Sequence, residues 1–217
     1  MSTNLRATVK ELGDVTGKSD SCGWMFDEVA WLLHAFVIFI RPEIVIQTGH
    51  LWGKSACMIL HALRYQMEIE GNTPQGDAAF DTFVHSRIAE RPSFGQLISV
   101  DPGGYAKGGY DWLTEHFPGQ FKHYQITSAD FFEAEGKRLK DEYAGKEVFG
   151  VVDGDHSIEG CRKDLLALIE LGARVIFVDD TEWLKELCDV SREVATANGY
   201  QFINLNYLNG VALLVRS

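Results

Sequence analysis

The sequence is poor in basic charge and has no run of Lys or Arg. Its 217 residues include 20 Lys and Arg against 31 Asp and Glu, a formal net charge of −11. A nucleic-acid backbone requires a basic surface, so we expect no nucleic-acid partner. Long hydrophobic runs are also lacking. The apolar segment 29–40 is too short to cross a bilayer and follows Asp27 and Glu28, which indicates a core helix and no membrane partner.

Paired cysteines and a secretory leader are absent as well. No two of the four cysteines form a C-x-x-C pair, so neither a zinc site nor a redox motif is indicated. We expect reduced, mostly buried thiols at Cys22, Cys57, Cys161 and Cys188. The first twenty residues mix Lys, Glu, Asp and Arg and do not resemble a signal peptide. The expected location is therefore cytoplasmic.

The length suits one domain with a substantial core. We expect a single domain over residues 1–217, with 46% apolar residues as in ordinary globular proteins. Residues 1–21 are polar and are expected to be loose. Residues 71–95 form an insertion rich in turn-forming residues that could serve as a lid.

Short apolar runs alternate with amphipathic segments from residue 43 onward. Strands are predicted at 43–48, 96–101, 121–127, 147–153 and 174–179. The runs "EIVIQT", "VFGVVD" and "RVIFVD" are nearly continuously apolar, which is typical of parallel strands covered on both faces. The segments between strands carry apolar residues at helical spacing, so each crossover is predicted to be helical and right-handed.

The C-terminal part departs from this alternation. Two strand-like runs, 200–207 and 211–216, are joined around Asn209-Gly210, which predicts a hairpin. A further helix, from about residue 24 to residue 40, should pack across the sheet. The sequence therefore predicts an α/β protein with a doubly wound, Rossmann-like, seven-stranded sheet that is mostly parallel and ends in an antiparallel C-terminal hairpin.

In such a sheet ligands bind beyond the carboxyl ends of the strands. After the first strand, Gly49 permits a sharp turn and Gly53 would let a ligand approach the next helix. Asp101 ends the second strand, placed to accept hydrogen bonds from two ribose hydroxyls. Residues 128–130, Ser-Ala-Asp, follow the third strand, where an adenine could be contacted. The spacing is not G-x-G-x-x-G, which argues against a nicotinamide cofactor.

Acidic residues gather after the fourth and fifth strands. Asp153 and Asp155 follow one strand, and Asp179 and Asp180 follow the other. Four carboxylates at one edge repel each other unless a cation or hydrogen-bond donors compensate them. Hard oxygen ligands suit Mg²⁺, Ca²⁺ or Mn²⁺. The alternative is that Asp155 and Asp180 are helix N-caps.

The segment "VDGDHSIEGCRKDL", followed by "VIFVDD", resembles the signature of small class I S-adenosylmethionine-dependent methyltransferases. These are grouped with macrocin-type sugar O-methyltransferases and cephalosporin-hydroxylase-like proteins. Residues 49–56 ("GHLWGKSA") resemble the first motif of this family and "ISVDP" the second, and the resemblance covers about residues 24–216. It implies that S-adenosylmethionine is held by Gly49, Gly53, Ser55, Asp101 and Asp130. Gln47 stands where the family has an acid that meets the amino group of methionine.

Relatives that bind a divalent cation, such as catechol and caffeoyl-CoA O-methyltransferases, imply further roles. Asp153, Asp179 and Asp180 match the metal-binding positions, with Asp180 in place of an Asn. The implied ion is Mg²⁺ or Mn²⁺. His156 matches the position of the general base and Trp183 would line the acceptor pocket, which makes His156 and Asp153 the expected catalytic residues.

We therefore expect an O-methyltransferase acting on a small hydroxylated acceptor, such as a sugar or a catechol-like compound. The metal would lower the pKa of the acceptor hydroxyl, His156 would take its proton, and the oxygen would attack the methyl sulfonium. Two alternatives stay open. Asp153-Gly154-Asp155 is also a D-x-D motif of some glycosyltransferases, and Gln47 is compatible with a binding protein that has lost the chemistry. The sequence leaves homo-oligomer formation open.

Overall fold

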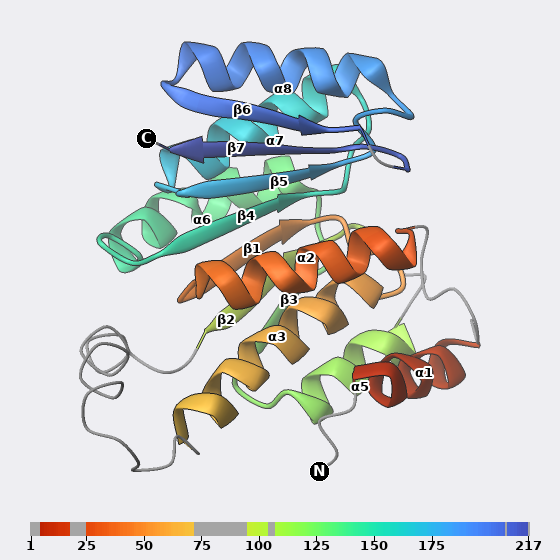
Figure 1. The fold of residues 1–217 in the computed structure, drawn as a ribbon. Helices are drawn as coiled ribbons and strands as arrows, with labels where there is room; N and C mark the ends of the chain where they lie inside the picture. Colours follow the sequence, from red (N-terminus) through yellow and green to blue (C-terminus); the bar gives the residue numbers. More distant parts are fainter. Residues whose placement is uncertain (1–4, 18–24, 72–94, 104–106, 207, 217) are drawn as a thin grey trace, which may run out of the picture.

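A computed structural model describes residues 5–17, 25–71, 95–103, 107–206 and 208–216. Seven strands of this part form one sheet in the order β3-β2-β1-β4-β5-β7-β6 (Figure 1). Their bounds are β1 Ile44–Thr48, β2 Gln96–Val100, β3 Phe121–Tyr124, β4 Val148–Val152, β5 Val175–Asp179, β6 Tyr200–Leu205 and β7 Val211–Arg216. Neighbouring strands from β3 to β5 are parallel, and β7 runs antiparallel to both β5 and β6. The predicted fold class is confirmed.

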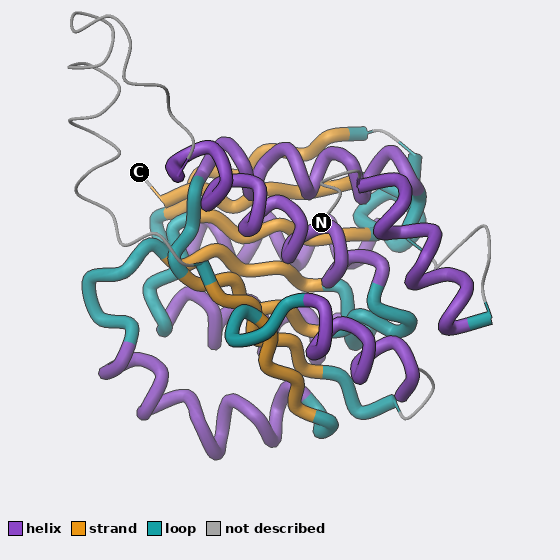
Figure 2. The backbone as a smooth tube through the Cα atoms, turned by 90° about the horizontal axis from the view of Figure 1, so that it is seen from below, coloured by secondary structure: helices purple, strands orange, loops and turns teal. Residues whose placement is uncertain are grey.

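Helices cover both faces of the sheet (Figures 1 and 2). One face carries α1 Leu5–Thr16, α2 Asp27–Ile40, α3 Lys54–Gly71 and α5 Lys107–His116. The other carries α6 Ser128–Glu142, α7 Ile158–Glu170 and α8 Lys185–Ala197. Every residue of β1, β4 and β5 is buried as a result. This explains why those strands read as unbroken apolar runs rather than as alternating ones.

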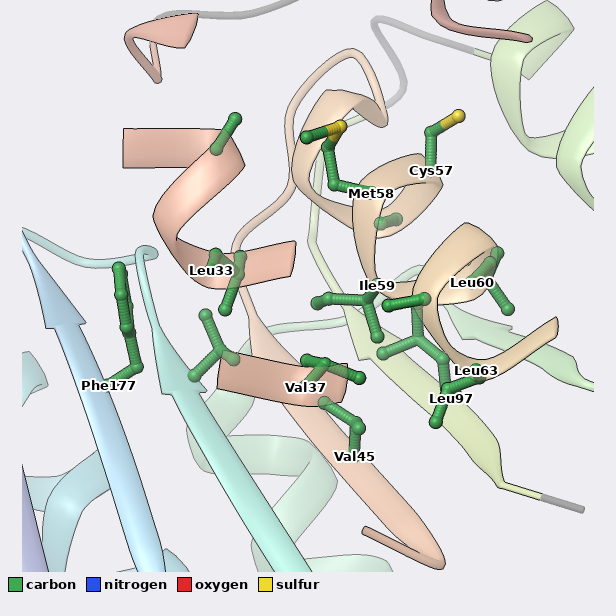
Figure 3. Packing of buried hydrophobic residues seen from close by; sticks show 14 of the residues in the cluster. Leu33, Val37, Val45, Cys57, Met58, Ile59, Leu60, Leu63, Leu97 and Phe177 are labelled. Atoms are coloured by element: carbon green, nitrogen blue, oxygen red, sulfur yellow. The ribbon is translucent and has the colours of Figure 1, made fainter. Parts of the chain in front are cut away.

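The helix expected from about residue 24 to residue 40 is α2, and it packs across the sheet as predicted. Leu33 and Val37 of α2 lie in one cluster with Val45 of β1 and Phe177 of β5, and α3 completes it with Ile59, Leu60 and Leu63 (Figure 3). This core fills the space between the central strands and helices α2 and α3.

The N-terminal segment corrects one expectation. Residues 1–21 were expected to be loose, but Leu5–Thr16 form α1, which contacts α3 and α5. Leu5 and Leu12 are buried there, and Val9 packs beside them. Their spacing of four and three residues places them on one helix face, a signal that the many polar residues between them obscure.

Some predictions fall outside the described residues. Residues 72–94 of the expected insertion and Cys22 are among them. Cys57, Cys161 and Cys188 are buried and carry free thiols, as predicted for them. Within the described ranges, no helix combines the length and the apolar character needed to span a membrane.

A buried histidine pair links α2 to α3. Nε2 of His34 lies 3.3 Å from Nδ1 of His61. Burial, and then the charge of His61, lowers the pKa of His34 to about 4. Its pKa is about 6.5 in an unfolded chain, so between these values the unfolded chain binds a proton that the folded chain does not. The free energy of unfolding must therefore fall as the pH falls through this window.

We expect the substitution His34→Gln, which keeps a polar partner for His61, to weaken this acid sensitivity. The wild type should lose about 1–2 kcal/mol more stability than the variant between about pH 7 and pH 4.5, a figure that allows for solvent screening at the pair. Urea unfolding of both proteins at the two pH values measures the difference. Equal losses would place the acid sensitivity in other groups.

Candidate functional site: a pocket at the switch point of the sheet

A pocket of about 900 Å³ lies at the carboxyl edge of the parallel strands. The chain builds outward from β1 to β3 and then returns to place β4 and β5 on the other side of β1, so the strand order reverses between β1 and β4. The loops after β1, β2, β4 and β5 line the pocket, together with the first turns of α6 and α7. Open α/β sheets bind their ligands at this place.

Gly49 permits a close approach between two of these loops. Its φ is +74°, and a Cβ atom there would lie 2.0 Å from the carbonyl oxygen of Asp153. Gly49 N donates to Val100 O at 2.8 Å, and Asp153 N donates to Thr48 O at 2.9 Å. Because only glycine fits both the left-handed backbone and this gap, Gly49 ties the loop after β1 to the ends of β2 and β4.

Gly53 serves a different purpose from the predicted one. It does not line the pocket. Its φ is +89°, and a Cβ atom would point at the side chain of Leu113 in α5, 3.0 Å away. Gly53 therefore allows the turn into α3 and close packing against α5, and its position does not support the expected contact with a cofactor.

Ser55 lines the pocket and is held from behind by Gln47. Nε2 of Gln47 donates to Oγ of Ser55 at 2.6 Å, and both side chains are buried. Oε1 of Gln47 has no hydrogen-bond partner among the described residues. The structure thus leaves a buried acceptor next to Ser55, but Gln47 itself does not line the pocket.

Asp101 lies at the end of β2 and is held by backbone amides. Its Oδ2 accepts from the N–H groups of His50 and Leu51, each at 3.0 Å, and its Oδ1 accepts from Gly103 N at 2.7 Å. Burial alone would raise the pKa of Asp101, but these bonds outweigh it and lower its pKa. A carboxylate has about four lone-pair sites, so one is left for a ligand rather than the two that ribose would need.

The histidine that binds Asp101 through its backbone N–H, His50, is uncharged. The sequence did not indicate this feature. Nδ1 of His50 lies 2.5 Å from Oγ of Ser99. Burial lowers the pKa of His50 to about 3, Asp101 opposes this effect, and His123 adds to it. His50 therefore stays uncharged, and its backbone N–H rather than its ring binds the carboxylate.

Lys54 is a second residue whose place the sequence did not indicate. It lines the pocket although its side chain is only 6% exposed. Its Nζ donates to Met25 O at 2.8 Å and to Oδ1 of Asp27 at 2.5 Å. Lys54 thereby joins the start of α2 to the pocket wall.

Asp130, predicted to bind the cofactor, is not among the residues that line the pocket. Its backbone N–H donates to Oγ1 of Thr127 at 3.1 Å, and that hydroxyl donates to its Oδ2 at 2.7 Å. This reciprocal pair caps the N-terminus of α6. Thr127, Ser128 and Ala129 of the same segment do line the pocket.

Asp153, His156 and Asp180 form the acidic end of the pocket. Each offers one ligand atom, and the three atoms lie within 4.8 Å of one another. Nδ1 of His156 is 3.4 Å from Oδ2 of Asp180. Asp179, predicted as a third metal ligand, lines the same pocket but is not one of these three residues; it is 4% exposed and its Oδ1 accepts from Asp180 N at 2.9 Å. Asp180 has a φ of +61°, so the chain turns sharply between the two carboxylates.

The electrostatics of this cluster favour a cation. Burial, and then Asp179 and Asp180, raise the pKa of Asp153 well above its usual range, with a smaller contribution from Asp101. Burial and Asp180 raise the pKa of Asp179 to about 7. Burial also raises the pKa of Asp180, against the opposing effects of His156 and Asn209. The two carboxylates are hard oxygen ligands of the kind that suits Mn²⁺ or Mg²⁺, whereas an imidazole is the usual ligand of ions such as Zn²⁺.

Asp155 does not belong to this cluster. Its Oδ1 accepts from Ser157 N at 2.9 Å, and Ser157 caps α7 by accepting from Gly160 N at 3.0 Å. The N-cap of α8 is Leu184, so neither Asp155 nor Asp180 is a helix N-cap. The alternative explanation for these two carboxylates was therefore wrong.

Trp183 lies at the mouth of the pocket, 66% exposed. Its ring meets that of His156 edge-on, with centroids 6.1 Å apart. The backbone N–H of Trp183 donates to Asn209 O at 3.0 Å, in the turn before β7. The antiparallel hairpin thereby positions an aromatic side chain beside the acidic cluster.

Comparisons with known proteins agree with this architecture. No family model and no curated protein sequence matches the chain. Among solved structures, a putative caffeoyl-CoA O-methyltransferase from Staphylococcus aureus superposes with a TM-score of 0.66 at 10% identity, over 99% of this chain and 92% of that one. The chain has the methyltransferase fold.

Two further structures with this methyltransferase fold were determined with cofactor or product. The O-methyltransferase TomG from Streptomyces achromogenes, in complex with S-adenosylmethionine, gives a TM-score of 0.66 at 11% identity, over 100% of this chain and 92% of that one. An O-methyltransferase from Bacillus cereus, in complex with S-adenosylhomocysteine, gives a TM-score of 0.66 at 11% identity. The superposition covers 97% of this chain and 91% of that one. At such identities the likeness concerns the fold, and the macrocin-type grouping stays a prediction.

Proposed function

We propose that this chain is an S-adenosylmethionine-dependent O-methyltransferase that acts on a small hydroxylated acceptor with the help of a divalent cation. One observation carries the proposal. A single pocket joins an amide-held carboxylate, Asp101, to the group of Asp153, His156 and Asp180. A nucleoside-binding acid and a cation-binding cluster in one pocket suit a cofactor and an acceptor bound side by side.

The buried polar atoms fit the cofactor. Asp101 offers a ribose hydroxyl one acceptor site, and Ser55, which lines the pocket, offers a hydroxyl to the methionine part. Gly49 has no side chain, so the loops after β1 and β4 can lie close together at the floor of the pocket where the ligand would bind. When bound, S-adenosylmethionine supplies a methyl group on a sulfonium.

The chain's own residues then have the following roles. Asp153 and Asp180 would hold Mg²⁺ or Mn²⁺ through their carboxylates, and the ion would supply positive charge that favours an ionised acceptor hydroxyl. The Nδ1 atom of His156 faces Asp180, which would orient the ring and leave Nε2 to take the acceptor proton. Trp183 would cover the acceptor at the pocket mouth.

Calorimetry with S-adenosylhomocysteine tests the proposal. The wild type should bind it, and Asp101→Ala should weaken binding by about 1–3 kcal/mol, because a charged hydrogen-bond acceptor is lost. Asp130→Ala is the matched control, since that carboxylate accepts from the hydroxyl of the N-cap Thr127 and does not line the pocket, so its loss should leave the affinity unchanged.

Because Asp101 also holds the amides of its own loop, thermal unfolding of each variant confirms that it is folded. A UDP-sugar and NAD serve as competing ligands. Absence of S-adenosylhomocysteine binding by the wild type at millimolar concentration, or preference for a UDP-sugar, would overturn the proposal.

A further inference from the structure

A side chain of the C-terminal hairpin holds one carboxylate of the acidic cluster formed by Asp153, His156 and Asp180. Nδ2 of Asn209, in the turn between β6 and β7, donates to Oδ1 of Asp180 at 2.9 Å. The other oxygen of that carboxylate, Oδ2, lies 3.4 Å from Nδ1 of His156. Asp180 therefore has one oxygen bound by the hairpin, while the other faces the rest of the cluster.

The backbone of the turn does not require an asparagine at position 209. Its left-handed residues are Leu208, with a φ of +56°, and Gly210, with a φ of +83°, and Asn209 is not one of them. Asparagine is favoured in turns because it tolerates that conformation or because its side chain bonds to the backbone nearby. Here the side chain reaches 29 residues back along the chain to Asp180. This contact, rather than the turn, accounts for the residue.

Main-chain hydrogen bonds fix the turn independently of that side chain. Asn209 O accepts from Glu182 N at 2.5 Å and from Trp183 N at 3.0 Å. Gly210 O accepts from Thr181 N at 3.3 Å, and a Cβ atom on Gly210 would lie 2.3 Å from Glu182 N. The turn thus packs closely against the loop after β5. Substituting the side chain of Asn209 should remove its own hydrogen bond and leave the turn in place.

A hydrogen bond on one carboxylate oxygen limits how that carboxylate can bind a cation. Ca²⁺ takes about six to eight oxygen ligands and accepts carboxylates that bind through both oxygens. Mg²⁺ is smaller, demands octahedral geometry and keeps several waters beside one or two carboxylates. Because Asn209 occupies Oδ1 of Asp180, only Oδ2 is left for an ion. This arrangement suits the smaller, octahedral ions better than Ca²⁺.

We propose that Asn209 is a positioning residue of the metal site, which makes Asp180 bind through one oxygen and so shifts the preference of the site toward Mg²⁺ or Mn²⁺ and away from Ca²⁺. This inference rests on the proposed function, because it concerns the ion that Asp153 and Asp180 would hold. The amide of Asn209 is neutral, so it orients the carboxylate without adding charge to the cluster. Hydrogen bonds that orient metal ligands in this way contribute strongly to metal affinity.

The affinities of the full chain for Mn²⁺ and Ca²⁺ test this assignment. The electron paramagnetic resonance signal of free Mn²⁺ gives the first affinity, and displacement of bound Mn²⁺ by Ca²⁺ gives the second. Asn209→Ala should weaken Mn²⁺ binding by about 10- to 100-fold, the usual effect of losing such a hydrogen bond. Ca²⁺ binding should weaken less, because Ca²⁺ gains the second oxygen of Asp180. The ratio of the two affinities should therefore shift toward Ca²⁺.

Two further variants complete the test. Asn209→Leu also removes the donor but keeps more of the side-chain volume, so it should show the same shift as the alanine variant. Asn206→Ala is the matched control, because Asn206 is an exposed residue of the same connection whose Oδ1 accepts from Asn204. It should keep the wild-type ratio. Thermal unfolding without metal confirms that each variant is folded.

The ratio separates a positioning role from a structural one. If both Asn209 variants weaken Mn²⁺ and Ca²⁺ binding equally, or leave both unchanged, the inference is wrong and the proposed metal site stands without it. If the wild type binds neither ion, the metal part of the proposed function is overturned together with the inference.

Discussion

Replacing His156 by alanine should lower turnover by about 10²- to 10⁴-fold, the usual contribution of a general base. His156 lies in the pocket beside Asp153 and Asp180, with Nδ1 facing the Asp180 carboxylate. His156→Asn keeps a hydrogen-bond donor toward Asp180 but cannot take a proton, so it should be as inactive as the alanine variant. Methyl transfer measured at saturating cofactor, with Mg²⁺ or Mn²⁺ present, reports the effect.

The same variants decide between two roles for this imidazole. Its ring nitrogen lies close enough to the two carboxylates to be a ligand itself. If His156 acts as the base, the metal-induced rise in melting temperature should survive in His156→Ala while turnover falls. Loss of both would make it a metal ligand, and near-normal turnover in either variant would remove it from the chemistry.

The second large effect concerns Asp153. A cation that binds the folded chain stabilises it by mass action, by about 2.7 kcal/mol at a concentration 100 times its dissociation constant. We expect Mn²⁺ or Mg²⁺ to raise the melting temperature of the wild type and to leave that of Asp153→Asn unchanged. Without metal the variant should be the more stable protein, because burial and the carboxylates of Asp179 and Asp180 disfavour a charge at this position.

Asp155→Asn provides the matched control on the same loop. Its side-chain oxygen can still accept from Ser157 N, and it lies outside the cluster of ligand atoms, so this variant should respond to metal like the wild type. Differential scanning fluorimetry with and without a chelator measures all three proteins. If neither ion raises the melting temperature of the wild type while Asp153→Asn melts at a higher temperature, the cluster is only a group of mutually repelling carboxylates and not a metal site.

The central sheet could be predicted from residue patterns. β1, β4 and β5 are buried on both faces, so their sequences are continuously apolar, and the helices between strands show one apolar face. The turn at Asn209-Gly210 marked the antiparallel hairpin that β6 and β7 form. The N-terminal helix α1 was missed because its few apolar residues are separated by charged ones, and only contact with α3 and α5 shows which face is buried.

The candidate site was predictable to the level of strand ends but not of side-chain direction. Gly49, Ser55 and Asp101 lie in the pocket where strand topology places them. Gly53 and Asp130 lie equally close in sequence, yet one faces Leu113 and the other caps α6. Loop residues take directions set by local backbone angles and by neighbours from other elements, and no periodicity in the sequence reports these.

The sequence by itself determined the order of strands and helices and the edge of the sheet at which polar residues gather, because burial on two faces imposes a pattern on each segment. Only the tertiary structure decided which polar residues meet. Asp180, whose backbone is left-handed, comes together with Asp153 and with His156 from the loop after β4. The approach of α7 to the ends of β1 and β3 likewise buries Asp164 at the pocket wall. Such contacts join segments far apart in the chain, so their geometry follows from packing rather than from local sequence.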